Sequence, residues 1–190
     1  MQYITQSYTY TYEVKQSKFI AHFVPIKLFK KKLEELQLDH PKARHFVTAQ
    51  RYLNEYEQIV EHSSDDGEPK GTSGKPSLMV LQGQNIIESG VIIVRYFGGT
   101  KLGTGGLVRA YSEAVNGVIN LASLQIYKKE IVQKIILAYN DVRRVEYACQ
   151  NAYVTIVEKQ FLDEVIFILK GKEESVISLL DELQRVVKTL

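Results

Sequence analysis

A strand, a glycine-rich loop and an apolar helix follow one another between residues 91 and 122, and this succession constrains the fold more than any other feature. Residues 91–97 are almost continuously apolar, which is typical of a strand buried on at least one face. Five glycines then occur within residues 98–106. Glycine tolerates positive φ and leaves backbone N–H groups uncovered, so this loop can turn sharply or approach a ligand closely. Apolar residues at helical spacing from Leu107 to Ala122 predict a largely buried helix.

The first two thirds of the chain contain further regular patterns around this unit. Tyrosine and threonine alternate over residues 8–12, which predicts a strand with its tyrosines on one face. Residues 55–75 are polar and punctuated by glycine and proline, so they are interpreted as a long loop. We expect strands over 8–12, 18–24, 45–53 and 91–97, and helices over 27–38 and 107–122.

The pattern resets near residue 127, which indicates a second domain. Apolar periodicity from residue 129 onward predicts the order βαββα, with a closing strand over 187–190. This order suits a small ferredoxin-like domain. The predicted elements are strands over 132–139, 152–157 and 164–169 and helices over 141–150 and 173–186. We therefore expect an α+β fold with one domain over 1–126 and a ferredoxin-like domain over 127–190.

Bulk properties exclude several classes of protein. Apolar residues make up 45% of the 190 positions, enough for a real core. Cys149 is the single cysteine, so no intrachain disulfide can form, which suits a reducing cytosol. The sequence has no secretory signal pattern and no apolar run long enough to span a membrane. We expect a cytoplasmic protein without membrane association.

The glycine-rich loop does not match two familiar nucleotide-binding motifs. Gly98 and Gly103 have the spacing of a Walker-type loop, but Thr104 stands where that motif needs lysine. A dinucleotide fingerprint would use Gly103 and Gly105, but Val108 replaces its third glycine. The sequence therefore predicts neither an NTPase nor a Rossmann enzyme, and no cofactor. A cradle for an anion and a tight packing turn both remain open for the loop.

Charge is segregated locally although the formal net charge is only +2. Residues 55–68 contain six acidic residues and no lysine or arginine, whereas residues 69–111 contain five basic residues and one acid, Glu88. The basic run suits contacts with phosphate, but it could equally pair with the acidic run inside the molecule. The candidate phosphate or nucleic-acid ligands are Lys70, Lys75, Arg95, Gly98, Gly99, Lys101, Gly103, Gly105 and Arg109.

The acidic residues near position 65 do not form a recognisable metal or catalytic motif. The spacing of His62, Asp65, Asp66 and Glu68 matches no zinc pattern, and Gly67 comes too early for a calcium loop. Adjacent carboxylates in a loop are more often turn formers and caps than an acid–base pair. We therefore predict no catalytic residue and no metal, and we assign Asp65, Asp66 and Glu68 to a structural or interaction loop.

Three segments carry a family resemblance. Residues 64–76 read Ser-Asp-Asp-Gly-Glu-Pro-Lys-Gly-Thr-Ser-Gly-Lys-Pro, residues 94–112 contain the glycine-rich loop, and residues 17–22 read Ser-Lys-Phe-Ile-Ala-His. Together they resemble the signatures of the IMPACT/YigZ family, over about residues 1–125. The chain departs from the family at Val47, where relatives often carry cysteine. The remainder resembles the small C-terminal domain of bacterial members.

The resemblance implies both a fold and a role. The first domain would be similar to the second domain of a small-subunit ribosomal protein, an α/β sandwich also found in elongation factor G, and the second to the last domain of that factor. Eukaryotic relatives regulate translation by binding the activator of a stress kinase. Our leading hypothesis is a non-enzymatic, translation-associated regulator that binds RNA or the ribosome. The alternatives are a protein-binding regulatory module, and an enzyme acting on a phosphorylated small molecule with Asp65, Asp66 or Glu68 as base.

Overall fold

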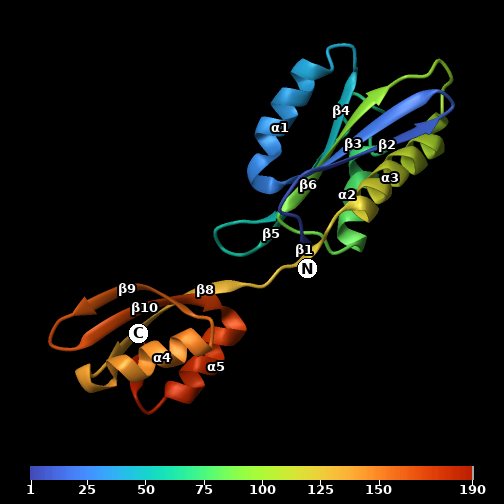
Figure 1. Cartoon of the computed structure of the whole chain (residues 1–190). Helices are drawn as coiled ribbons and strands as arrows, with labels where there is room; N and C mark the ends of the chain where they lie inside the picture. The colour runs from blue at the N-terminus through green and yellow to red at the C-terminus, as the bar shows by residue number, and fades with distance from the viewer. Residues whose placement is uncertain (190) are drawn as a thin grey trace. The chain divides into compact units, whose positions relative to one another are not determined.

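The computed structural model describes residues 1–189, and its internal contacts divide the chain into two units, Met1–Tyr127 and Lys128–Leu190 (Figure 1). The boundary lies one residue from the expected one. Both units combine helices with antiparallel sheets, which confirms the expected two-domain α+β fold. Among the described residues, no helix is long and apolar enough to cross a membrane.

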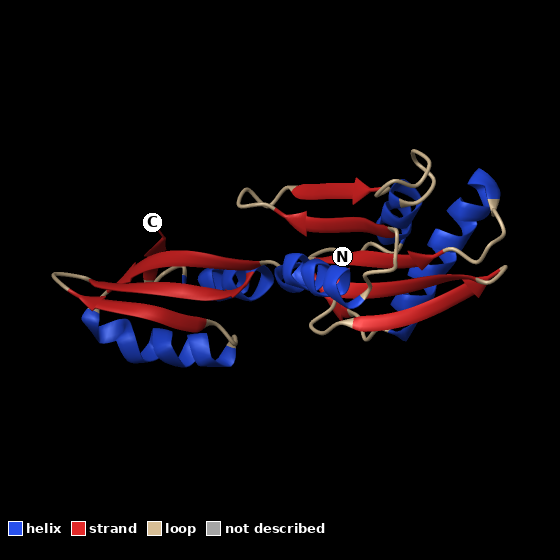
Figure 2. Cartoon of the chain, turned by 90° about the horizontal axis from the view of Figure 1, so that it is seen from above, coloured by secondary structure: helices blue, strands red, loops and turns tan. Residues whose placement is uncertain are grey.

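The first unit is built on a five-stranded antiparallel sheet in the order β2-β3-β6-β4-β5. The central strand β6 is buried over seven of its eight residues. The sheet lies between helices on both of its faces (Figures 1 and 2). The strands are β2 (Tyr8–Val14), β3 (Ser17–Pro25), β4 (His45–Leu53), β5 (Ile59–Ser64) and β6 (Ser89–Tyr96).

Burial on both faces explains the continuous apolar run in β6. Ile92 and Val94 pack under α1 (Ile26–Asp39), together with Phe29 and Leu36 of that helix. Val91 and Ile93 point to the opposite face, where they join the larger core under α2 (Gly74–Gly83) and α3 (Gly103–Leu121). Because successive side chains of a strand alternate between faces, both sets must be apolar when both faces are covered.

A short two-stranded sheet ties together the two ends of the first unit. β1 (Gln2–Tyr3) pairs with β7 (Gln125–Ile126) in antiparallel register. The amide of Tyr127 donates a further hydrogen bond to the Met1 carbonyl at 3.0 Å. The first and last residues of the unit are therefore hydrogen-bonded to each other, and the last ones lie where the apolar periodicity of the sequence changes.

The second unit has the strand order β11-β8-β10-β9, with every neighbouring pair antiparallel. This is the ferredoxin-like arrangement that the element order predicts. Both helices pack on one core that includes Phe167 and Ile135. Position 190 of the expected closing strand lies outside the described residues. The elements are β8 (Glu130–Leu137), η1 (Tyr139–Asp141), α4 (Val142–Asn151), β9 (Thr155–Phe161), β10 (Val165–Lys172), α5 (Glu173–Leu183) and β11 (Val187–Thr189).

The expected loop over 55–75 is wrong in part, because it contains β5 and the start of α2. β5 is an edge strand that pairs with β4 alone, and five of its six residues are exposed. An exposed edge strand needs no apolar alternation, so its sequence resembles a loop. The helix expected from residue 107 begins earlier, at Gly103, and therefore includes three glycines of the loop in its first turn.

Candidate functional site

The loop between β5 and α2 is organised around the carboxylate of Asp65. One oxygen, Oδ1, accepts hydrogen bonds from the amides of Ser73 and Gly74 at 3.1 and 2.8 Å and from the Ser73 hydroxyl at 2.7 Å. The other accepts from the Gly71 amide at 2.7 Å. Burial raises the pKa of Asp65, but these hydrogen bonds outweigh it and hold the pKa below 3.8. Asp65 therefore satisfies the backbone donors at the start of α2.

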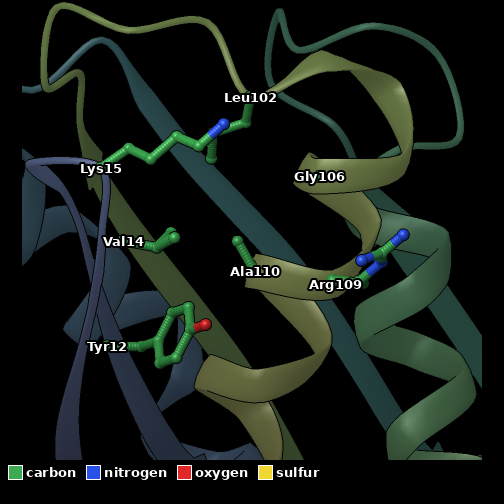
Figure 3. Close-up of a pocket in the computed structure, with 7 residues that line it drawn as sticks. All are labelled: Tyr12, Val14, Lys15, Leu102, Gly106, Arg109 and Ala110. Carbon is green, nitrogen blue, oxygen red and sulfur yellow. The ribbon is translucent and has the colours of Figure 1, made fainter.

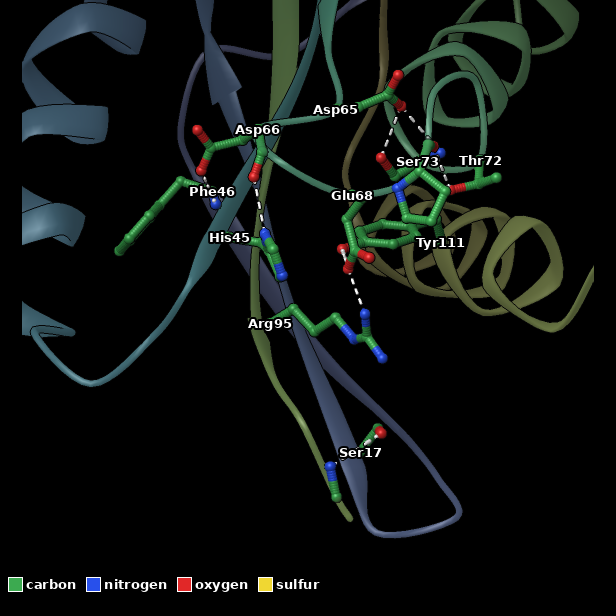
Figure 4. Close-up of polar contacts among 12 residues, drawn as sticks. Ser17, His45, Phe46, Asp65, Asp66, Glu68, Thr72, Ser73, Arg95 and Tyr111 are labelled. Carbon is green, nitrogen blue, oxygen red and sulfur yellow. Dashed lines mark hydrogen bonds and ion pairs between the residues drawn. The ribbon is translucent and has the colours of Figure 1, made fainter. Parts of the chain in front are cut away.

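Asp66 fastens the same loop to the sheet. Its Oδ2 accepts a hydrogen bond from the Phe46 amide at 2.6 Å, and its carbonyl oxygen lies 2.7 Å from His45 Nδ1 (Figure 4). The backbone passes through positive φ at Asp66 and Gly67, 43° and 82°, which lets the chain reverse beside His45. Glycine is the residue that adopts this conformation at the lowest cost.

Glu68 turns inward from this loop and meets two residues of the core. Its Oε1 forms an ion pair with Arg95 Nη1 at the end of β6, and it accepts a hydrogen bond of 2.8 Å from the Tyr111 hydroxyl on α3. Both charged side chains are buried, with exposed fractions of 3% for Glu68 and 8% for Arg95. Burial and then the nearby Glu68 charge raise the pKa of Tyr111 far above 10, so the phenol stays protonated.

Aromatic rings complete the surroundings of Arg95. Its guanidinium carbon lies 5.3 Å from the ring centre of Phe19 and 5.9 Å from that of Phe97, within range of a cation–π interaction. The Phe19 ring in turn meets Tyr111 edge-on at 5.0 Å. The geometry therefore assigns Arg95 to an internal network rather than to the exposed basic surface. For this pair, the acidic and basic runs meet inside the molecule.

Close packing against the β2–β3 turn requires glycine at position 98. Its amide donates a hydrogen bond to the Ser17 hydroxyl at 3.1 Å, and a Cβ on Gly98 would lie 2.0 Å from the backbone carbon of Gln16. The β2–β3 turn therefore lies directly against the start of the glycine-rich loop. Gly99 and Gly103 have positive φ, 86° and 74°, with open space where a side chain would be. A Cβ on Gly105 would also meet nothing within 4 Å.

The other basic candidates lie on the layer formed by α2, α3 and the loops that lead into them. Lys75 lies in the first turn of α2, which packs beside α3, and Arg109 lies on α3. Across residues 69–83 and 97–121 the only acid is Glu113. Within residues 1–189, none of the four basic side chains forms an ion pair or a hydrogen bond: Lys70, Lys75, Lys101 and Arg109, all exposed.

The sequence reasoning missed how Tyr111 and Ser17 contribute. Tyr111 was expected only as a core residue of the helix, and its spacing gives no sign that its hydroxyl meets Glu68, 43 residues away. Ser17 belongs to a segment that carries the family resemblance, which was the one available signal. No group of three or more histidine, cysteine or acidic side chains suited to a metal occurs among the described residues.

The fold and the site define a two-domain α+β protein. Its first unit carries an acidic loop between β5 and α2 and a glycine-rich loop between β6 and α3, and the ion pair of Glu68 and Arg95 links the two. Residues 15–119 match the Impact N-terminal domain, which is more than half of the chain. The chain belongs to the IMPACT family.

Named relatives agree with this assignment. An IMPACT family member of Haemophilus influenzae is 34% identical over 174 residues, covering 90% of this chain and 84% of the relative. The IMPACT family member YigZ of Escherichia coli is 40% identical over 116 residues, 60% of this chain and 57% of the relative. A crystal structure of a hypothetical protein, 28% identical, aligns with a TM-score of 0.68 over 100% of this chain and 95% of that one.

Proposed function

We propose that this chain is a non-enzymatic, translation-associated regulator that binds RNA or the ribosome. The binding surface is the exposed layer of α2, α3 and their leading loops, which we call the basic face. It consists of Lys70, Lys75, Lys101 and Arg109. The single observation that carries the proposal is that these four cations have no acidic partner within the described chain, whereas Arg95 is neutralised by Glu68.

The glycines of the loop fit this role because no side chain covers the backbone at these positions. Gly99, Gly103 and Gly105 all have open space at the position of a side chain, so a phosphate backbone can approach the main chain there. Membership of the IMPACT family supports a link to translation, because the resemblance implies that eukaryotic members regulate that process. RNA and the ribosome both present the phosphate groups that exposed lysine and arginine contact.

Binding to ribosomes and to a structured RNA over a series of salt concentrations tests the proposal. The variant Lys70→Ala/Lys75→Ala/Lys101→Ala should bind more weakly and with a smaller salt dependence, by about 0.7–0.9 in the log–log slope for each lost phosphate contact. The matched control changes three exposed lysines that form no ion pair and lie on or beside α1, across the sheet, Lys27, Lys30 and Lys42. Equal loss in both variants, or no salt-dependent binding by the wild type, would contradict the proposal.

A protein-binding regulatory module is the second candidate, favoured by apolar side chains on and beside the same layer. Phe97 and Met79 are 56% and 59% exposed, and Val108 is 37% exposed. Aromatic residues and methionine are enriched in protein interfaces. Capture of a partner from lysate that survives RNase treatment, with loss on Met79→Ser, would favour this candidate. The enzyme alternative is less favoured, because the carboxylates of Asp65, Asp66 and Glu68 all accept hydrogen bonds within their own unit.

A further inference from the structure

The first unit contains a pocket of about 330 Å³ between β2 and the start of α3, shown in Figure 3. Lys15 extends across its opening toward Leu102, whereas the Arg109 guanidinium points away from it. Among the lining residues, Lys15 is therefore the one cation directed at the pocket, and a single exposed lysine does not define a ligand. Apolar and charged side chains that the fold leaves without partners gather instead on the second unit.

Three large apolar side chains lie exposed together at one end of the second unit, where the β9–β10 hairpin meets the start of α4 (Figure 1). Tyr139 belongs to η1, Phe161 ends β9, and Leu162 lies in the turn that follows. Their exposed fractions are 53%, 55% and 63%. We call these three residues the apolar patch. Exposed apolar side chains that cluster, rather than occur singly, are typical of interaction sites.

The patch is held in shape by the fold. The ring centres of Tyr139 and Phe161 lie 6.2 Å apart, and the Tyr139 hydroxyl donates a hydrogen bond to the Leu162 carbonyl. Phe161 pairs with the buried Val165 across the hairpin, and the Leu162 amide donates to the Glu164 carbonyl at 3.1 Å. Because the patch is ordered in advance, a partner that binds there pays little conformational entropy.

Charged side chains of both signs flank the patch. Arg143 and Arg144 lie in the first turn of α4, shortly after Tyr139, whereas Asp163 and Glu164 directly follow Leu162 in the hairpin turn. All four charged side chains are exposed. Within residues 1–189, none of them forms an ion pair or a side-chain hydrogen bond. The patch therefore has an apolar centre and a rim that carries both cations and anions.

The two arginines occupy an electrostatically unfavourable position within their own unit. The N-terminus of a helix carries a partial positive charge, so cations in its first turn are disfavoured. The first turn of α4 contains no acidic residue, and Asp141 at the N-cap makes no side-chain capping hydrogen bond. Carboxylates supplied from outside the unit would compensate both the arginines and the helix end.

We propose that the apolar patch is a homodimer interface, at which it packs against the same patch of a second copy of this chain. A twofold axis through the patch places each surface against itself. Arg143 and Arg144 of one copy then meet Asp163 and Glu164 of the partner subunit, and this contact is made twice. An apolar centre inside a rim of complementary charges is the usual anatomy of a protein interface.

Charge complementarity favours a second copy over other occupants. The rim supplies in one place both the cations and the anions that a copy of itself requires. A nucleic acid would meet Asp163 and Glu164 as well as the arginines, and its phosphates would be repelled by these carboxylates. The dimer goes beyond the proposed function, which depends on the basic face of the first unit.

Sedimentation velocity of the full chain over a range of concentrations measures this self-association. Three apolar side chains form a small interface, so we expect a weak dimer with a Kd of about 1–100 µM. Leu162→Asp should weaken it about tenfold or more, because the apolar contact is replaced by two like charges. Tyr153→Ser is the matched control, since Tyr153 is 92% exposed but follows the far end of α4, and the Kd should not change.

Charge reversal tests how the two copies meet. Arg143→Glu/Arg144→Glu and, separately, Asp163→Lys/Glu164→Lys should each weaken the dimer about tenfold or more, because like charges then face each other. An equimolar mixture of the two variants should form a heterodimer about as tight as the wild-type dimer, since opposite charges meet again across the interface. A merely structural role of these side chains would not produce this recovery.

Three results would overturn the proposal. The first is a wild type that remains monomeric up to about 300 µM. The second is a dimer that Leu162→Asp and both charge reversals leave unchanged, which would place the contact elsewhere. The third is a mixture of the two charge variants that associates no better than either variant alone. Thermal unfolding checks that each variant is folded, and the charge variants alter only exposed side chains, so they decide the result if Leu162→Asp unfolds.

Discussion

Glu68 and Arg95 form an ion pair inside the first unit, with exposed fractions of 3% and 8% for their side chains. Glu68 comes from the acidic loop, whereas Arg95 comes from the end of β6 just before the glycine-rich loop. The pair therefore directly joins two of the three segments that carry the family resemblance, residues 64–76 and 94–112. Arg95 stabilises the platform on which the exposed basic residues lie.

Breaking this pair from one side should be costly. Replacing Glu68 by leucine leaves the Arg95 charge buried without its partner, and we expect the free energy of unfolding to fall by about 3–5 kcal/mol. Urea denaturation measures this loss. Adding Arg95→Met to the same chain should recover a large part of it, because no buried charge then remains.

The exposed pair of Lys18 and Glu13, at 3.1 Å, is the control for this prediction. Glu13→Ala should cost less than about 1 kcal/mol, because solvent screens that pair. A Glu68→Leu variant as stable as Glu13→Ala would show that the buried pair contributes little.

Asp65 should make the first unit sensitive to acid. Its pKa is held below 3.8 by hydrogen bonds from the backbone of the loop, so its contribution to stability is present above pH 3.8 and is lost as the pH falls through the lower folded-state pKa. Asp65→Asn should lower the free energy of unfolding at pH 7 by about 1–3 kcal/mol. The difference between wild type and variant, measured by chemical denaturation from pH 7 to pH 2, should shrink at the acidic end. A difference that is constant over this range would contradict the prediction.

His22 should also make the free energy of unfolding depend on pH, in a range above that of Asp65. Burial, followed by the charges of Lys32 and His40, lowers the pKa of His22 from 6.5 to about 4, while its Nδ1 lies 3.0 Å from the Thr9 hydroxyl. The unfolded chain takes up a proton near pH 6.5 and the folded chain does not, so stability falls between pH 6.5 and 4 by about 3 kcal/mol. In His22→Leu this part of the pH dependence should disappear from denaturation curves. His62→Gln, on the exposed edge strand, should keep the wild-type profile.

Two glycines of the same loop should respond to alanine with opposite sign. At Gly98 the added Cβ would lie 2.0 Å from the Gln16 backbone, so we expect a loss of more than about 2 kcal/mol. At Gly105, a helical position where the Cβ meets nothing within 4 Å, alanine should add about 0.5–1 kcal/mol. Thermal unfolding of the two variants side by side tests the pair. A stable Gly98→Ala would mean that the β2–β3 turn can move away from the loop.

Local patterns were sufficient for most of the fold. The apolar run of β6, the alternation of β2 and the βαββα order of the second unit are patterns of residues that are neighbours in sequence, and each pattern predicted its element, although it was the structure that showed β6 to be buried on both faces. The edge strand β5 was missed because an exposed strand carries no apolar alternation. The early start of α3 was missed because glycine is a poor helix former in isolation.

The sequence by itself determined the family, the two-domain α+β architecture and the segments that carry the candidate site, since motifs and periodicity are properties of consecutive residues. Only the tertiary structure decided which charged side chains form ion pairs inside the molecule and which stay exposed. Glu68, Arg95 and Tyr111 come from a loop, a strand and a helix, and their meeting depends on how β6 and α3 pack. The same packing leaves Lys70, Lys75, Lys101 and Arg109 exposed and, within residues 1–189, without an ionic partner, because burial and pairing depend on the neighbours that a side chain meets in space.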